Sequence, residues 1–189
     1  GIITGAVSIV WSIIVSALLV ISMLSIATVG TQIKDTYTEY QNTYNSYNDS
    51  QQALINAKKD YSKGETARFE NFDIKVNSIQ RNYSREYYEA DEGKEYIVVN
   101  ISVTNKSSDS EYFAAYELEM NDGGLIDSRS YVSVDSEYDD GTLATGATET
   151  GNIVYEVDAN STNLKLQYEA TAYDVDYNPV KLTYTLALY

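Results

Sequence analysis

The chain has 189 residues, with 28 acidic and 13 basic side chains, so its formal net charge at neutral pH is −15. An acidic surface repels phosphate backbones, which argues against nucleic acid as a partner. Histidine and cysteine are both absent, which excludes disulfides, imidazole bases, thiolate chemistry and the usual zinc ligands. We therefore expect a protein that is not an enzyme and that needs no cofactor or metal.

The first 33 residues, which end at Ile33, contain no charged side chain. Within them the apolar run from Ile2 to Val29 is interrupted only by Ser, Thr and Gly. A helix of about 28 residues is roughly 42 Å long, more than the hydrocarbon thickness of a bilayer, about 30 Å. The segment predicts a hydrophobic α-helix that crosses a membrane or forms the core of a filament.

Small residues are interleaved with large ones in this segment, which lets helix backbones approach each other closely. Trp11 lies in its middle, away from the ends where aromatic belts of membrane spans lie. The alternative is a plain membrane anchor, because small residues also occur in ordinary spans. We expect the residues of an assembly helix to be Gly1, Ile2, Gly5, Ala6, Ile9, Trp11, Ser12, Ile13, Ser16, Leu19, Val20, Met23 and Leu24.

A heptad-like spacing continues after the uncharged segment and predicts a polar, tyrosine-rich extension of the helix over residues 34–63. Asn, Ser and Thr lower the helix propensity of this stretch, so its seam needs a neighbour and residues 48–50 are its weakest point. Lys58, Lys59 and Lys63 suit the last turn of a helix that ends at Gly64. The helix seam comprises Ile33, Tyr37, Tyr40, Tyr44, Tyr47, Leu54 and Tyr61.

The uncharged segment, its Gly1 start and the C-terminal head resemble the type IV filament superfamily of archaeal pilins, archaellins and bacterial type IV pilins. In that superfamily a prepilin peptidase cuts ahead of the hydrophobic helix, which then packs with its copies in the filament core. Gly5 stands where bacterial pilins usually carry Glu, so the resemblance points to the archaeal branch. It implies three partners: copies of the chain in a helical homopolymer, the cytoplasmic membrane before assembly, and the peptidase with its assembly machinery.

Beyond Gly64 the pattern changes to alternating apolar and polar residues, separated by turn-prone segments, as in an antiparallel sandwich. In the strongest of these strands, Ile97, Val99 and Val103 are expected to face the core. The predicted fold class is α+β: a long N-terminal hydrophobic α-helix over residues 1–63, followed by an immunoglobulin-like β-sandwich over 64–189. Strands are predicted at 68–79, 95–105, 112–121, 125–131, 148–158, 163–172 and 180–188.

A second resemblance covers most of residues 69–170. The segments FDIKVNSIQR, GKEYIVVNISVTNKSS, YELEMNDG and LATGATETGNIVYEVD look like a prokaryotic family of immunoglobulin-like extracellular domains of undefined function. This resemblance implies a sandwich that faces the exterior, and it supplies packing residues but no catalytic set.

Two further groups of residues are candidate sites. Asp135, Glu137, Asp139 and Asp140 form an acidic loop, but the Gly and Glu positions of an EF-hand do not fit it, so we expect a solvated loop. Five N-x-S/T sequons are candidates for N-glycosylation. They begin at Asn48, Asn82, Asn100, Asn105 and Asn160.

Two functions are open at this point. The first is a structural subunit of an extracellular helical filament, a pilus or an archaellum, that serves adhesion or motility and is inserted in the cytoplasmic membrane before assembly. The alternative is a monotopic membrane-anchored protein whose sandwich binds a cell-envelope layer or an assembly partner.

Overall fold

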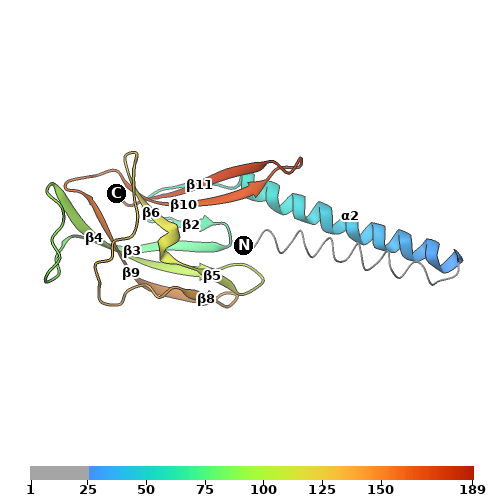
Figure 1. The fold of residues 1–189 in the computed structure, drawn as a ribbon, viewed down its shortest axis with the longest axis horizontal. Coiled ribbons are helices and arrows are strands. Elements are labelled where there is room, and N and C mark those ends of the chain that lie inside the picture. The colour runs from blue at the N-terminus through green and yellow to red at the C-terminus, as the bar shows by residue number, and fades with distance from the viewer. Residues whose placement is uncertain (1–25) are drawn as a thin grey trace. The chain divides into compact units, whose positions relative to one another are not determined.

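A computed structural model describes residues 26–189 of the chain, with side chains from Gln32 onward (Figure 1). The chain divides into two compact units, residues 1–51 and 52–189. All thirteen residues of the expected assembly helix precede residue 26, so that prediction lies outside the described part.

The α-helix of the described part, α2 (Ile26–Asn56), runs without a break through residues 48–50. Serine and threonine hydroxyl groups, which usually disfavour helices, find hydrogen-bond acceptors within α2. Thr38, Thr43 and Ser50 each donate to the carbonyl oxygen four residues earlier, at 2.8, 2.9 and 2.9 Å. Each hydroxyl thus shares the i−4 carbonyl with the helix, which satisfies the hydroxyl without ending the helix.

The helix ends at Asn56, eight residues before the stop that Gly64 predicts, so the expected bound was wrong. The lysines expected in its last turn lie beyond it. Lys59 instead donates its ammonium group to the carbonyl oxygens of Ile55 and Ala57, at 2.5 and 3.0 Å. Its own carbonyl accepts from Thr185 N at 2.7 Å. Pairing with a strand far along the chain therefore overrides the local helix signal.

The predicted α+β class with a long hydrophobic helix is also wrong. The described part is a β-sandwich that carries one α-helix, and that helix is rich in tyrosine, asparagine and charged residues. Among residues 26–189, no helix is long and apolar enough to cross a membrane. The heptad spacing of this stretch reflects a seam of tyrosines on a polar helix rather than the continuation of an apolar one.

Two main sheets form the sandwich (Figure 1). The first has the order β1 (Asp60–Tyr61), β11 (Pro179–Ala187), β10 (Leu164–Tyr173), β6 (Leu118–Asp122) and β7 (Leu125–Asp127). The second has the order β2 (Thr66–Phe69), β3 (Phe72–Tyr83), β4 (Lys94–Asn105) and β9 (Thr148–Asp158). A short pair, β5 (Glu111–Phe113) with β8 (Gly141–Leu143), and a 3-10 turn, η2 (Ala115–Glu117), complete the described elements.

The strands differ from the prediction in several places. The segment 68–79 is divided into β2 and β3 by a two-residue turn in which Glu70 has a φ of 50°. A left-handed backbone is unusual for glutamate, but Tyr168 of the facing sheet donates its hydroxyl to Glu70 Oε2 at 2.9 Å. Burial raises the pKa of the Glu70 carboxyl. The segment 112–121 is divided by η2, and β1 and β8 were not expected.

The core lies between the two sheets, and the expected inward face of β4 is confirmed: Ile97, Val99 and Val103 have no exposed area. Aromatic rings complete this core. Phe69 stacks on Tyr168 with ring centroids 5.8 Å apart, a favourable geometry for buried rings. The alternation of apolar and polar residues therefore predicted the buried face of β4 correctly.

The outer face of β4 holds a smaller cluster, which the alternation did not predict. Tyr96 and Val98 of β4 pack there with Val154 of β9 and Val132 of the loop between β7 and β8. The loop runs along β9, where Ser130 N donates to Val154 O at 2.8 Å. A loop rather than a strand or helix therefore covers this end of the sheet.

Replacement of Gly151 in β9 tests how closely the backbone of this loop approaches the strand. A Cβ at this position would lie 2.4 Å from Cα of Tyr138 in the loop. We expect Gly151→Ala to lower the free energy of unfolding by roughly 1–3 kcal/mol, because backbone must move to make room. Urea denaturation measures the effect. Gly141→Ala is the matched control, because a Cβ there meets no atom within 4 Å; equal stability of the two variants would contradict the close approach.

Candidate functional site

The connector between α2 and the sandwich, residues 57–65, is built into the first sheet. Its strand β1 pairs in parallel with β11, with Asp60 opposite Thr185 and Tyr61 opposite Leu186. Thr185 also donates its hydroxyl to Asp60 Oδ1 at 2.8 Å. The connector therefore adds an edge strand to the sheet beside the last strand of the chain.

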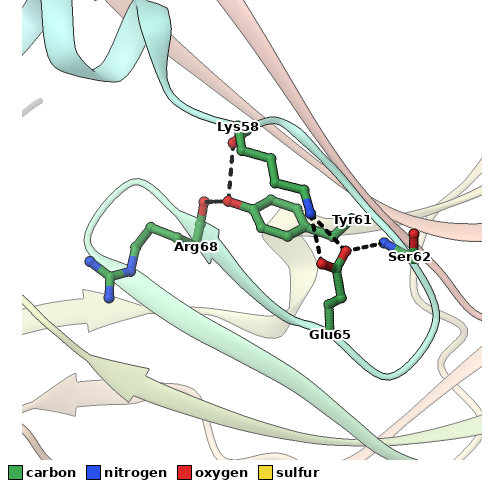
Figure 2. Close-up of polar contacts among 5 residues, drawn as sticks. All are labelled: Lys58, Tyr61, Ser62, Glu65 and Arg68. Atoms are coloured by element: carbon green, nitrogen blue, oxygen red, sulfur yellow. Dashed lines mark hydrogen bonds and ion pairs between the residues drawn. The ribbon is translucent and has the colours of Figure 1, made fainter.

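Polar contacts close the connector on itself (Figure 2). The Tyr61 hydroxyl lies 3.0 Å from Lys58 O and 3.1 Å from Arg68 O. Lys58 Nζ lies 4.8 Å from the centroid of the Tyr61 ring and donates to both Glu65 oxygens at 2.8 Å. Ser62 N donates to the same carboxylate at 2.6 Å. The Lys58 hydrogen bond lowers the pKa of Glu65. These contacts make the connector a fixed part of the sandwich.

A surface pocket of about 410 Å³ lies between the end of β3 and the turn that joins β9 to β10. Its charged residues are Arg81 and Glu95, and Glu95 is only 6% exposed. Arg81 Nε donates to Glu95 Oε1 at 2.9 Å, and Arg81 Nη1 donates to Ser161 O at 2.6 Å. Asn82 N donates to Glu95 Oε2 at 2.9 Å. The pocket is lined by Arg81, Asn82, Glu95, Ala159, Asn160 and Thr162.

The opposite charges of Arg81 and Glu95 neutralise each other, and both side chains have hydrogen-bond partners within the protein. The Arg81 hydrogen bond lowers the pKa of the Glu95 carboxyl, so this group stays ionised. A carboxylate that is held ionised by an arginine is a poor proton donor at neutral pH, because a general acid must keep its proton until it acts. The chemistry of this pair is that of a structural ion pair rather than of a catalytic acid.

The acidic loop that ends at Asp140 is also used within the fold. Arg129 bonds to Glu137, and its second guanidinium nitrogen lies 3.7 Å from Asp140 Oδ2. Asp140 Oδ1 accepts from Ala115 N at 2.8 Å. Among residues 26–189, no group of three or more acidic side chains is arranged to hold a metal ion. Two carboxylates of the loop, those of Glu137 and Asp140, are positioned by contacts with Arg129 and Ala115.

The five sequons lie in different environments. Asn105 has no exposed area, and its Nδ2 donates to Asp109 O at 2.7 Å and to Leu143 O at 2.8 Å. Asn100 belongs to a ladder on β4, where it donates to Asn152 Oδ1 at 2.7 Å. Asn82 and Asn160 are exposed beside the Arg81 pocket. The side chain of Asn105 organises a turn, a role that the sequon pattern could not reveal.

The seam residues are divided between the two units. Ile33, Tyr37 and Tyr40 are exposed on α2, and Tyr44 and Tyr47 are half-buried. Tyr40 and Tyr44 stack with ring centroids 6.2 Å apart. The last two seam residues, Leu54 and Tyr61, pack against the core of the sandwich. The heptad spacing therefore continues across both units, and its last two residues contact the core of the sandwich.

Comparison with known proteins places the sandwich among domains of undefined role. A family model described as a domain of unknown function, DUF4352, matches residues 61–177. No curated protein matches the chain. Among solved structures, the yjhA protein of Bacillus subtilis is 17% identical, with a TM-score of 0.50 over 67% of this chain and 99% of that one.

Two other solved structures resemble the sandwich more loosely. A candidate lipoprotein of Bacillus subtilis, ycdA, is 15% identical with a TM-score of 0.46; the match covers 61% of this chain but only 36% of that one. A β-sandwich protein of Clostridium difficile is 16% identical with a TM-score of 0.40, over 70% of this chain and 97% of that one. At these identities the likeness concerns the fold.

The Arg81–Glu95 pair predicts a pH-dependent contribution to stability. We expect Glu95→Gln to lower the free energy of unfolding by roughly 1–3 kcal/mol at pH 7, because Arg81 loses its charged partner. The pKa of Glu95 is lowered by folding, so the contribution is present above the ordinary carboxyl value, about 4.3, and is lost as pH falls through the folded value.

Urea denaturation of both proteins from pH 7 to pH 3 measures this contribution. The stability gap between wild type and Glu95→Gln should close as the pH falls. Glu92→Gln is the control, because Glu92 is exposed on a loop. A gap that stays constant with pH would show that the charge of Glu95 is not what stabilises the fold.

Asn105 provides a test of the buried sequon. We expect Asn105→Ala to lower the free energy of unfolding by roughly 2–4 kcal/mol, because two carbonyl groups lose their donor. Thermal or urea unfolding measures it. Asn48→Ala, on α2, should show no loss, because alanine has a higher helix propensity than asparagine. A stable Asn105→Ala variant would contradict the structural role.

Proposed function

We propose, from the premise that this chain belongs to the DUF4352 family, that it is a membrane-anchored surface protein whose sandwich binds a cell-envelope layer or an assembly partner. The observation that carries the proposal is the connector. Strand β1 and the contacts of Lys58, Tyr61 and Glu65 hold the residues that follow α2 against the sandwich. The chain therefore passes from α2 into a paired strand without a long free linker, which suits a head that is carried by an anchor.

The distribution of charge supports the anchor. Every acidic and basic side chain lies after Ile33, and the residues before it are, apart from Gln32, apolar or small. Ionisable groups are expensive inside a bilayer, so an uncharged stretch of this length is suited to one. The acidic remainder favours the aqueous side, and we place the sandwich outside the cytoplasmic membrane.

The contents of the sandwich favour binding over catalysis. The Arg81 pocket is an open surface hollow whose charged pair is internally satisfied. The absence of histidine and cysteine removes the commonest bases and nucleophiles. We propose a non-enzymatic role, in which the protein binds a partner through its surface and does not catalyse a reaction.

A filament subunit is the second candidate. Its support is the small residues among the first 33, such as Gly5, Ser12 and Ser16, which suit close packing between copies. The fold class does not support a filament subunit, because the described helix is polar. The anchored protein requires no assembly of copies, so it needs fewer assumptions.

Cell fractionation tests the anchor. We expect the full chain with a C-terminal epitope to sediment with membranes, to resist carbonate extraction and to be released by detergent. Protease added to intact cells should remove the epitope. The variant that lacks residues 1–33 should be recovered in the soluble fraction.

Two outcomes would count against the proposal. A full chain that is soluble without detergent would remove the anchor. Filaments that contain the chain, seen by electron microscopy of sheared extracellular material, would favour the second candidate instead.

A further inference from the structure

Two loops lie side by side on the outer face of the second sheet. One joins β3 to β4 (residues 84–92), and the other lies between β7 and β8 (residues 128–140). The Tyr83 hydroxyl, just before the first loop, donates to Ser133 O of the second at 3.2 Å. Arg85 Nη1 and Asp135 Oδ1 also lie 3.2 Å apart. We call these two loops the tyrosine-acid surface.

Three tyrosines project from this surface. Tyr87 is 92% exposed, Tyr131 is 100% exposed and Tyr88 is 46% exposed. The fold gains no packing from the first two rings, although aromatic side chains are among the largest sources of buried area. Tyr87 also has a φ of 71°, a left-handed conformation that is strained for a bulky residue. Exposed rings held at such a position are suited to a contact outside the chain.

The surface is also strongly acidic. Its two arginines, Arg85 and Arg129, are already paired with carboxylates of the second loop. Most of its acidic groups have no basic partner within it, so the surface keeps a negative potential. The acidic residues of the two loops are Glu86, Glu89, Asp91, Glu92, Asp135, Glu137, Asp139 and Asp140.

This charge selects the partner. A second copy of the chain presents the same negative surface and is repelled, as are anionic lipid headgroups and nucleic acid. A metal bridge has no support among the described residues, where acidic groups are not arranged to hold an ion. Lysine and arginine side chains satisfy both features at once, because a cation pairs with carboxylates and lies favourably over a tyrosine ring.

We propose that the tyrosine-acid surface binds a lysine- or arginine-rich segment of another protein. The inference rests on the proposed function, since it states the chemistry of the partner that the anchored sandwich binds. The carboxylates attract the basic segment through long-range electrostatic interactions. Tyr87 and Tyr131 provide cation–π contacts, which form only when a lysine or arginine cation lies over the ring.

Binding of a fluorescent octalysine peptide to the full chain in detergent micelles tests the inference by fluorescence anisotropy at about 50 mM salt. We expect Y87S/Y131S to weaken binding about five- to ten-fold, through the loss of two cation–π contacts. The matched control is Y112S/Y116S. Tyr112 and Tyr116 are 55% and 63% exposed and adjoin Glu111 and Glu117, and their replacement should leave binding unchanged.

A second pair of variants separates local charge from net charge. E86Q/E89Q should weaken binding and reduce its dependence on salt, because two carboxylates of the surface are neutralised. D35N/E39Q makes the same change in net charge on α2 and should have no effect.

Three results would overturn the inference. Equal weakening by both tyrosine pairs, or by both charge pairs, would reduce the binding to general attraction by an acidic protein. Binding of neutral dextran that Y87S/Y131S abolishes would make the surface a sugar site. No binding of octalysine by the wild type would refute it outright. Membrane fractionation of the same variants keeps the two proposals apart, because loss of peptide binding with sedimentation intact leaves the anchor standing.

Discussion

The sandwich depends on β4, which is paired along its length with β3 on one side and β9 on the other. Its inward residues, such as Ile97 and Val99, are buried between the two sheets, and burial of apolar side chains there is what holds a sandwich together. A shift of one residue in its register would turn these side chains outward. The register of β4 thus determines which side chains the rest of the chain has to cover.

The outer face of β4 is covered by two means. Near its C-terminal end a polar ladder joins it to its neighbours, and Ser102 and Thr150 hydroxyls lie 2.8 Å apart there. Near its N-terminal end Tyr96 and Val98 are apolar and require a cover, which the loop through Val132 supplies. Backbone hydrogen bonds beside Gly151 hold that loop down: Tyr138 N donates to Asn152 O at 2.9 Å, and Asn152 N donates to Ser136 O at 2.8 Å. The loops that present the exposed tyrosines are therefore fixed by the packing beneath them.

Charge is used in two ways in this protein. Where opposite charges are paired, as in Arg81 with Glu95 and Lys58 with Glu65, they join segments of the sandwich to each other. Where acidic groups outnumber basic ones, as on the loops around Tyr87 and Tyr131, the excess is presented to the solvent. This division of charge is the basis on which we propose an anchored protein that selects a basic partner.

The longer strands of the sandwich and the inward face of β4 follow from the sequence, because burial of one sheet face imposes a period of two on neighbouring residues. The divisions at Glu70 and at η2, and the short strands β1 and β8, do not follow from it. The sequence also determined that the first 33 residues carry no charge. The tertiary structure alone decided that α2 stops at Asn56, that Asn105 is a buried bonding group, and that Arg85 meets Asp135. These features depend on contacts between residues far apart in the chain, which no local pattern of residues records.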